Sequence, residues 1–344
     1  MPRRRLRLAL DASPLVVEPR RGVARALAHL RAGLAACADE VEVVAFAPAP
    51  GETPRAFRRR VAREVRPVGF DAWYAPFSAF PDVAVPVVVC VHELPFVRHG
   101  PVEGRLRAFV HRRWLHRDVA RAAAIVVPSE ATRADVLVVR PDAAAKVHVV
   151  PHGFAPAGEG GGRGPGPRGP AARAGGLVLG ARGRRKGLDV WARAVSGLAP
   201  VVPWTLVGRP PRGVLALARG VPVEVLDDPD DAEVARRLAG AAVLAYPSRS
   251  EGFGYPPLEA MAAGVPVVAS AAGAIPEVVG DAALLVPPGD ADALRAALRR
   301  VLVEPALAAG LVARGAARAR AFPPEATARS LLKIVREAVE RGGA

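Results

Sequence analysis

The sequence has 344 residues, of which 51% are hydrophobic and 5% aromatic, with two cysteines and a formal net charge of +15. A chain of this length is expected to form roughly two domains, and its hydrophobic share excludes an intrinsically disordered protein. Because Cys37 and Cys90 lie far apart in the sequence, they indicate neither a disulfide framework nor a cysteine zinc site, and the reducing cytoplasm is the expected compartment.

The positive charge by itself says little about partners, since almost all basic residues are arginines spread over both halves of the chain. With few aromatic residues and no recognisable nucleic-acid motif, a basic nucleic-acid-binding protein rests on charge alone, and no nucleic-acid partner is expected. No apolar run reaches the roughly 18 residues that a membrane span needs. The N-terminal stretch is predicted to be a first strand rather than a signal peptide, because Arg7 and Asp11 interrupt it.

The first predicted elements form a βαβ unit, with a strand at 7–11, a helix at 22–37 and a strand at 40–46. The loop after the first strand lies where a doubly wound sheet binds ligands. It contains a basic-glycine turn at 20–23, so Gly22 is a candidate binding residue. An ordinary connecting loop is an equally good interpretation.

Residues 55–66 are predicted to form the most one-sided helix of the chain. Phe57, Val61 and Val65 repeat every four residues, and six arginines occupy most of the remaining surface. Such a helix is most often a solvated surface helix with one core-facing seam, but a basic amphipathic helix can also lie on an anionic membrane surface. Both interpretations stay open.

Residues 85–96 are predicted to form a buried strand that ends in His92. A lone histidine at a strand end is usually a satisfied structural residue, but ligands also bind at the carboxyl ends of α/β strands, which makes His92 a candidate functional residue. Residues 123–137 predict a strand followed by a helix that Ser129 caps. His152 receives no role, and no residues have the types and spacing of a metal site.

Residues 158–170 contain seven glycines and three prolines, and a segment of this composition cannot form a core. We therefore expect a flexible linker at 154–175, which marks a domain boundary. The expected structured parts are a first domain at 1–153, a second domain at 176–322 and a last helix at 323–344.

The second domain opens with a strand, a glycine-rich basic turn and a helix in residues 176–195. Backbone amides and cations in such a turn are typical of phosphate binding. Lys186 is the leading candidate, because lysine is rare in this chain and its ammonium is a compact phosphate partner. A basic turn without function, in an arginine-rich protein, is the alternative.

The densest pattern lies in residues 250–270, where seven residues separate Glu251 from Glu259. A Pro-Pro pair predicts a helix start and Gly264 predicts its end, which puts Glu259 in the first helical turn. Since proline has no N–H group, the amides of residues 258–260 would be the open donors at this helix start, where anions bind. The plain alternative is a tight turn before a helix with a favourable N-terminal charge.

The glycine-rich basic turn, Lys186 and the Glu251-x7-Glu259 pattern together resemble the signature of retaining glycosyltransferases of family 4. The resemblance spans nearly the whole chain, is densest over residues 176–298 and leans towards mannosyltransferases. It implies the GT-B fold, an α/β architecture of two Rossmann-like doubly wound domains that face a cleft, with a C-terminal helix crossing back to the N-terminal domain. Acidic residues within 225–229 replace a glycine that is usual in the family, which leaves the nucleotide base open.

In that family the first glutamate and the neighbouring amides hold the sugar, the second glutamate holds the ribose, and an arginine and a lysine clamp the donor diphosphate. Lys186 matches that lysine, and Arg182 and Arg184 are rivals for that arginine. The residues that the resemblance implies as catalytic are His92, Arg182, Lys186 and Glu251. Those that it implies in donor binding are Gly22, Arg184, Gly252, Phe253, Gly254, Tyr255, Leu258, Glu259 and Gly273.

The resemblance thus implies a retaining, metal-independent hexosyltransferase, with mannose favoured, that needs no cofactor and uses a GDP- or UDP-linked sugar as co-substrate. The acceptor would be a glycan or a lipid-linked molecule in the synthesis of cell-surface polysaccharide or glycolipid. The enzyme would be cytoplasmic, and peripheral on the inner face of the cell membrane if residues 55–66 bind that surface. A GT-B-fold epimerase that acts on a nucleotide sugar stays an alternative, which the intact Glu-x7-Glu pattern disfavours.

Overall fold

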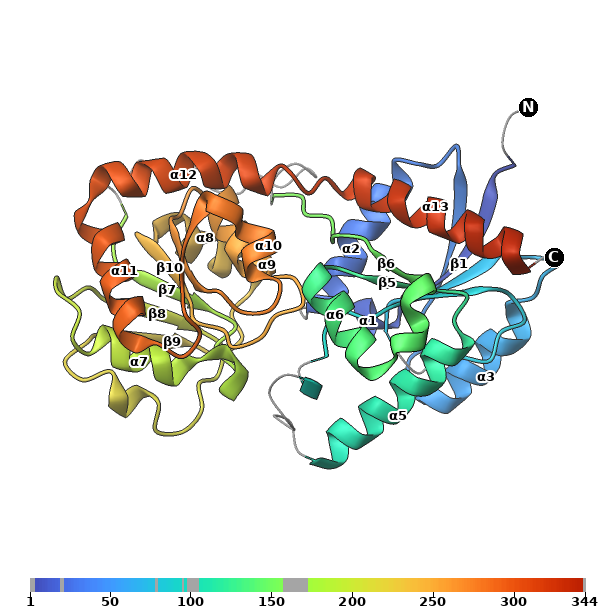
Figure 1. The fold of residues 1–344 in the computed structure, drawn as a ribbon, viewed down its shortest axis with the longest axis horizontal. Helices are drawn as coiled ribbons and strands as arrows, with labels where there is room; N and C mark the ends of the chain where they lie inside the picture. Colours follow the sequence, from blue (N-terminus) through green and yellow to red (C-terminus); the bar gives the residue numbers. More distant parts are fainter. Residues whose placement is uncertain are drawn as a thin grey trace. The chain divides into compact units, whose positions relative to one another are not determined.

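The structure, a computed structural model, describes residues 4–18, 22–77, 80–94, 96–97, 105–156 and 173–342. The chain divides into two compact units (Figure 1): the first comprises Met1–Phe154 and Phe322–Ala344, and the second comprises Ala155–Ala321. Most of the expected linker, residues 157–172, lies outside the described residues. Each unit is built on its own parallel sheet.

The first unit has a six-stranded sheet of order β2-β1-β3-β4-β5-β6 within the described residues, and every neighbouring pair is parallel. Its strands are β1 (Leu6–Asp11), β2 (Val41–Phe46), β3 (Ala72–Ala75), β4 (Val87–Cys90), β5 (Ala124–Val127) and β6 (Val147–Val149). Side chains alternate between the two faces: Leu8 and Leu10 of β1 enter one core, and Ala9 enters the other.

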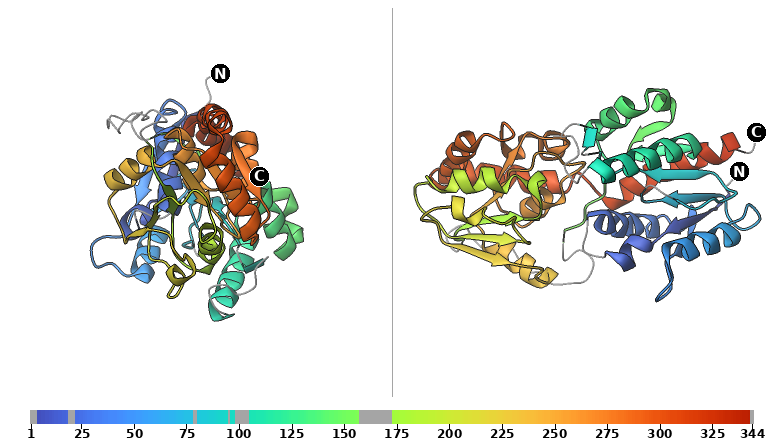
Figure 2. Two further views of the ribbon diagram at one scale, coloured as in Figure 1. Left: turned by 90° about the vertical axis from the view of Figure 1, so that its left-hand side faces the viewer. Right: turned by 90° about the horizontal axis from the view of Figure 1, so that it is seen from below.

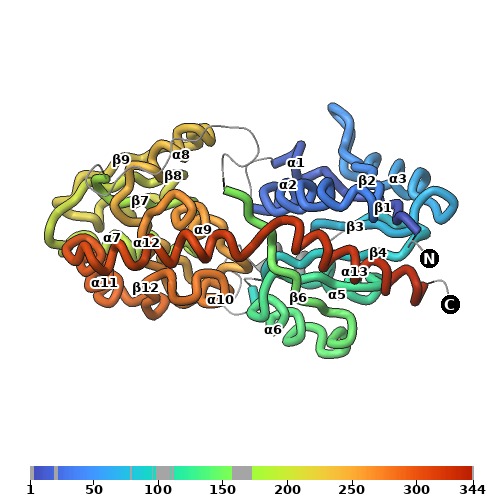
Figure 3. Tube along the Cα trace, turned by 90° about the horizontal axis from the view of Figure 1, so that it is seen from above, coloured from blue at the N-terminus to red at the C-terminus, as the bar shows by residue number. Residues whose placement is uncertain are grey.

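Helices cover both faces of this sheet. They are α1 (Ser13–Val17), α2 (Gly22–Ala35), α3 (Pro54–Glu64), α5 (Arg105–Arg121), α6 (Glu130–Val139) and α13 (Pro324–Gly342), with the 3-10 helix η1 (Pro141–Lys146). α2 and α13 share one core, whereas α3, α5 and α6 pack into the other (Figure 2). The last helix of the chain therefore belongs to the first unit, where it lies against α2 (Figure 3).

Two of these helices begin and pack as their sequences indicate. The Thr53 side chain caps α3, Pro54 follows it, and Phe57 and Val61 are buried, so the core-facing seam is confirmed. α6 begins after Ser129, whose hydroxyl accepts a hydrogen bond from a backbone amide of the first turn, as expected.

The second unit has a sheet of order β12-β11-β10-β7-β8-β9, again with six parallel strands among the described residues. Its strands are β7 (Gly176–Leu179), β8 (Trp204–Val207), β9 (Val223–Leu226), β10 (Val243–Tyr246), β11 (Val267–Ser270) and β12 (Ala283–Val286). Its helices are α7 (Leu188–Val195), α8 (Asp231–Gly240), α9 (Tyr255–Ala262), α10 (Ile275–Val279), α11 (Ala291–Val303) and α12 (Pro305–Ala319), with the 3-10 helices η3 (Arg184–Lys186), η4 (Leu215–Leu217) and η5 (Gly280–Ala282).

A pair of tryptophans anchors the core of the second unit. Trp191 of α7 and Trp204 of β8 are buried, and their rings meet edge to face with centroids 5.7 Å apart. This contact fixes the helix after the basic turn against the sheet. None of the described helices is long and apolar enough to cross a membrane.

Candidate functional site

The loops that follow β7 and β10 leave the second sheet where its strand order reverses. β7 pairs with β8 on one side and with β10 on the other. In a doubly wound sheet, the connections leave the carboxyl ends of two such strands in opposite directions, and ligands bind there. The loop after β7 carries Lys186, and the loop after β10 carries Glu251. Two candidate residues from distant parts of the sequence thus lie at the same edge of one sheet.

Glu251 is a buried carboxylate that two cations hold. Its Oε1 atom lies 2.6 Å from Nζ of Lys186, and its Oε2 atom lies 3.7 Å from a guanidinium nitrogen of Arg185. The Lys186 ammonium also donates to the hydroxyl of Tyr246 at 3.3 Å, and Arg185 donates to the Ser250 carbonyl at 3.1 Å. Only 8% of Glu251 is exposed, so the charged carboxylate depends on these cations.

Burial and the two cations act in opposite directions on the pKa of Glu251. Burial raises this pKa, but the charges of Lys186 and Arg185, with the hydrogen bond from Lys186, outweigh burial and lower the pKa to about 2. Burial, followed by the charge of Glu251, raises the pKa of Tyr246 well above its usual value. At neutral pH the site therefore holds a charged carboxylate beside a neutral phenol.

Two glycines bring the backbones of this site into close contact. Gly187 has φ +64, and a Cβ atom there would lie 2.0 Å from the Pro247 carbonyl oxygen. Gly273 has φ +55, and a Cβ atom would lie 2.3 Å from the carbonyl oxygen of Glu251, which accepts a hydrogen bond from the Ala274 amide at 2.9 Å. Gly273 was expected to let the backbone approach a donor. In the structure the approach that requires glycine is to the backbone of Glu251.

Helix α9 begins earlier than the sequence indicates. Its N-cap is Gly254 and its first residue is Tyr255, so Glu259 lies in the second turn, and its prediction in the first turn was wrong. The amides of residues 258–260 therefore lie inside the helix, where amides bond to the preceding turn, rather than at its open end. Because the next two residues are prolines, the N–H groups at this helix start belong to Gly254 and Tyr255.

The side chains of this segment are part of the core. Phe253, Tyr255 and Leu258 are buried, and the first two rings pack edge to face with centroids 5.2 Å apart. Gly254 has φ +116, and a Cβ atom there would lie 2.7 Å from the side chain of Ile275. The buried segment, with Gly252, can therefore offer a ligand its backbone rather than its side chains.

The sequence around this site matches known proteins. A model of the family described as Glycosyl transferases group 1 matches residues 176–304. These residues form a group 1 glycosyl transferase domain.

The MMP alpha-(1->4)-mannosyltransferase of Mycolicibacterium hassiacum is 54% identical over 78 residues, which are 22% of this chain and 19% of that protein. The O-antigen chain mannosyltransferase B of Escherichia coli is 45% identical over 92 residues, which are 27% of this chain and 24% of that protein. The matches thus span about a fifth to a quarter of the length of these relatives.

Solved structures match both units of the fold. Sucrose-phosphate synthase from Thermosynechococcus elongatus has a TM-score of 0.71 at 22% identity, and the match covers 97% of this chain and 99% of that chain. Anabaena Alr3699/HepE in complex with UDP-glucose has a TM-score of 0.68 at 17% identity, covering 98% and 100%. These matches confirm the expected GT-B fold. The relatives favour neither an epimerase nor a nucleic-acid-binding protein.

The arginine that approaches the carboxylate in the glycosyl transferase domain is Arg185, which the sequence interpretation did not select. Arg182 instead lies 3.7 Å from Asp227 and 3.9 Å from Asp228, and Arg184 is exposed. Asp228 has φ +65, a left-handed conformation that agrees with the glycine usual in this part of the family pattern. The signal for Arg185 was its place directly before the candidate lysine.

Two further candidates, Glu259 and Gly22, lie in other elements than the loop residues Lys186 and Glu251. Glu259 is partly buried in α9. Gly22 begins α2 of the first unit, and a Cβ atom there would meet nothing within 4 Å, so packing does not require a glycine. The basic residues before it, within 19–21, lie outside the described residues.

His92 belongs to the first unit, where both of its ring nitrogens are engaged. Nε2 lies 2.7 Å from the Pro76 carbonyl oxygen, and Nδ1 lies 2.9 Å from Nε2 of His152. Burial lowers the pKa of His92 to about 4, so the ring is neutral at pH 7. His152, for which no role was predicted, is therefore the direct partner of a candidate residue. Cys90 joins the pair, and one ligand atom from each of the three residues lies within 4.8 Å of the others, a grouping that the sequence spacing did not indicate.

Proposed function

We propose that the protein is a hexosyltransferase, with mannose favoured, that transfers a sugar from a nucleotide-diphosphate donor to a glycan or lipid-linked acceptor in cell-surface glycan synthesis. One observation carries the proposal: a buried Glu251 carboxylate, held by Lys186 and Arg185, lies at the strand-order reversal of a group 1 glycosyl transferase domain. The names of the curated relatives support mannose and a cell-surface product.

In this proposal the cations of the site bind the donor diphosphate. The Lys186 ammonium has three N–H donors, and its contacts with Glu251 and Tyr246 use two of them, which leaves one for a phosphate oxygen. As the bond to the sugar breaks, negative charge accumulates on the diphosphate. Lys186 and Arg185 would stabilise that charge in a partly buried site, where charges interact more strongly than in water.

The two glutamates would bind different parts of the donor. Glu251 and the backbone of residues 252–255 would orient the sugar, and Glu259 would accept hydrogen bonds from the ribose. Because the cations supply the charge that a metal ion supplies in other transferases, we propose metal-independent transfer without a cofactor. We also propose retention of the anomeric configuration, through attack on the face that the diphosphate leaves.

The membrane part of the proposal rests on α3. Arg55, Arg59 and Arg63 are exposed and lie four residues apart, so they share one side of the helix, away from the buried Phe57. Arg60 differs, because it forms an ion pair with Glu52 at 2.9 Å. The exposed arginines would bring the enzyme to an anionic lipid surface on the inner face of the cell membrane, where a lipid-linked acceptor resides.

The experiment is a thermal-shift panel of GDP-mannose, UDP-glucose, ADP-glucose and dTDP-glucose in chelator-treated buffer. A ligand that binds only the folded protein raises its apparent stability, so we expect a rise in Tm with the sugars of one base. GDP-mannose is favoured by the names of the relatives, and a UDP sugar by the solved complex of Alr3699/HepE with UDP-glucose. The rise should vanish in Lys186→Ala and persist in Lys333→Ala, which removes an exposed lysine of the first unit.

Product analysis completes the test. Incubation of the binding donor, labelled in its sugar, with membrane lipids and glycans should yield label in an extractable lipid or a polymer. Label found only in a donor with an altered sugar would make the epimerase the better function. A panel in which no nucleotide sugar shifts Tm would contradict the proposed donor site.

A further inference from the structure

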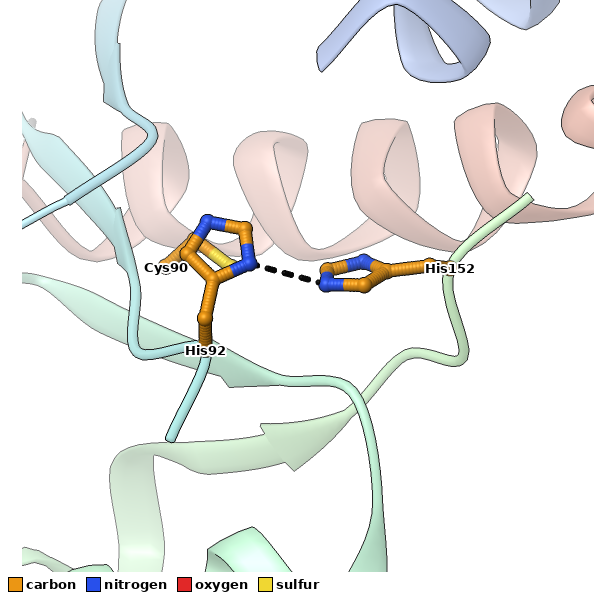
Figure 4. Close-up of side chains that lie close together, drawn as sticks. All are labelled: Cys90, His92 and His152. Carbon is orange, nitrogen blue, oxygen red and sulfur yellow. Dashed lines mark hydrogen bonds between the residues drawn. The ribbon is translucent and has the colours of Figure 1, made fainter. Parts of the chain in front are cut away.

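A second cluster of reactive side chains lies in the first unit, outside the glycosyl transferase domain. It consists of Cys90, His92 and His152, and one ligand atom from each lies within 4.8 Å of the others. Cys90 ends β4, His92 follows it, and His152 follows β6, so the carboxyl ends of two strands of one sheet supply all three. The two rings point towards each other, with the sulfur beside His92 (Figure 4).

The hydrogen bonds of His92 determine which nitrogen it can offer to a ligand. A carbonyl oxygen only accepts, so the Nε2 atom that lies 2.7 Å from the Pro76 carbonyl carries the proton. Nδ1 then has a lone pair, which points towards Nε2 of His152 at 2.9 Å. Metal-binding histidines typically donate their second N–H group to a carbonyl or carboxylate in this way. His92 is therefore already oriented as a ligand.

The cluster also borders a small cavity. This cavity of about 20 Å³ is lined by the three residues and by apolar side chains of α2 and α13, among them Leu27 and Leu331. That volume holds about one water molecule, which could be a further ligand of an ion held among the three side chains. Two imidazoles and a thiolate are a donor set typical of Zn²⁺, and three protein ligands leave one coordination position open.

We propose that Cys90, His92 and His152 bind one Zn²⁺ ion, or a transition-metal ion of similar preference, with a water molecule in the cavity as the fourth ligand. On binding, the Cys90 thiol releases its proton to solvent and its sulfur bonds to the ion. His152 shifts its proton from Nε2 to Nδ1, and Nε2 becomes a ligand. The water occupies the remaining position without losing a proton.

The surroundings of the cluster give the ion a structural role. A hydrogen bond from Thr327 of α13 to the carbonyl of Pro151, 2.8 Å long, joins the last helix to the residue before His152. An ion bound by His92 and His152 would add a link between this segment and the end of β4. The ion would stabilise the first unit, and this role is separate from donor binding by the second unit.

The test uses the full chain, freed of metal by dialysis against a chelator and then titrated with Co²⁺ or Zn²⁺. We expect saturable binding of one equivalent of Co²⁺, with the near-ultraviolet absorption of a cobalt–thiolate bond and the visible bands of tetrahedral cobalt. Zn²⁺ should abolish these bands by displacement and raise the Tm of the protein.

Matched variants locate the ion. Cys90→Ser should lose the cobalt–thiolate absorption, whereas Cys37→Ser, which alters the other buried cysteine, should keep it. His152→Asn keeps a polar side chain at this position without the imidazole nitrogen that would bind the ion, and it should fold and weaken Co²⁺ binding by more than about tenfold. Circular dichroism shows whether each variant folds. If Cys90→Ser does not fold, the Co²⁺ affinity of His152→Asn is the deciding measurement.

Three results would overturn the proposal. One is the absence of saturable Co²⁺ uptake by the unmodified protein. Another is uptake without cobalt–thiolate absorption, which would locate the ion at surface carboxylates or histidines. The third is absorption and affinity that stay the same in His152→Asn.

Discussion

Lys186 and Glu251 are separated by 65 positions in the sequence, yet Nζ of the lysine lies 2.6 Å from Oε1 of the glutamate. Both side chains are largely buried: 16% of the lysine side chain and 8% of the glutamate side chain are exposed. Removing two charges from water can cost more free energy than their mutual attraction returns. A buried ion pair is therefore weak evidence that its residues were selected for stability. Its position at the strand-order reversal explains it better as a preformed set of charges for a ligand.

The first prediction concerns the loss of one partner. Lys186→Met leaves the buried Glu251 carboxylate with Arg185 at 3.7 Å as its remaining cation, and we expect the second unit to lose about 3 kcal/mol of unfolding free energy. Amide exchange of peptides from β7 and β10 measures that free energy for this unit alone. Lys333→Met, at an exposed position, should change it by less than about 0.5 kcal/mol.

The double variant Lys186→Met, Glu251→Gln extends this prediction. It removes both charges, so it should recover part of the stability that Lys186→Met loses, because no carboxylate remains buried without its lysine. Equal exchange rates in the single variant and in Lys333→Met would show that the pair contributes nothing to the second unit.

The second prediction is a pH dependence. The pKa of Glu251 is about 2 in the folded protein and near 4.5 in an exposed chain, so between these values the unfolded state binds more protons than the folded state. The stabilisation is therefore fully present above about pH 4.5 and is lost as the pH falls towards 2. Amide exchange of β10 in the native protein and in Glu251→Gln should show a loss in this window that is larger in the native protein. Parallel pH profiles would contradict the assignment.

The sequence predicted the residues that follow from local patterns. A strand, a glycine-rich turn and a helix with apolar spacing placed Lys186 after β7, and a later strand, turn and helix placed Glu251 after β10. Lys186 and Glu251 lie close together because β7 and β10 are neighbours in one parallel sheet. The family resemblance already implied this arrangement.

The sequence did not predict what depends on turn geometry and on long-range pairing. Whether Arg182, Arg184 or Arg185 approaches the carboxylate depends on positive φ angles at the surrounding glycines, which a sequence pattern does not specify. The start of α9 was missed because the prolines were assumed to occupy its first position, whereas Tyr255 occupies it. His152 was missed because its partner is 60 residues away.

The third prediction concerns the glycine behind Glu251. In Gly273→Ala the new Cβ atom would lie 2.3 Å from a backbone oxygen of Glu251, and the backbone would keep a φ of +55 that alanine disfavours. We expect the free energy of unfolding to fall by about 2 kcal/mol or more, together with loss of the nucleotide-sugar shift in Tm, because the loop that carries Glu251 must move.

Gly289→Ala is the control, since its φ is also positive, +86, but its Cβ atom would meet nothing within 4 Å. It should cost about 1 kcal/mol and keep the shift. Equal effects of the two substitutions would show that the contact with Glu251 does not matter.

The last prediction tests the membrane surface proposed for α3. Replacing Arg55, Arg59 and Arg63 by Gln removes three exposed charges and leaves the ion pair of Arg60 intact. At about 1 kcal/mol for each basic residue near an anionic surface, binding to vesicles rich in phosphatidylglycerol should weaken about 100-fold. The matched control replaces three exposed arginines of the second unit by Gln, so it has the same net charge. These arginines are Arg212, Arg219 and Arg299. Vesicle sedimentation should separate the two variants, since only charges that face the lipid contribute within a screening length of about 10 Å. If both variants bind equally well, net charge alone brings the protein to the membrane, and α3 is an ordinary solvated helix.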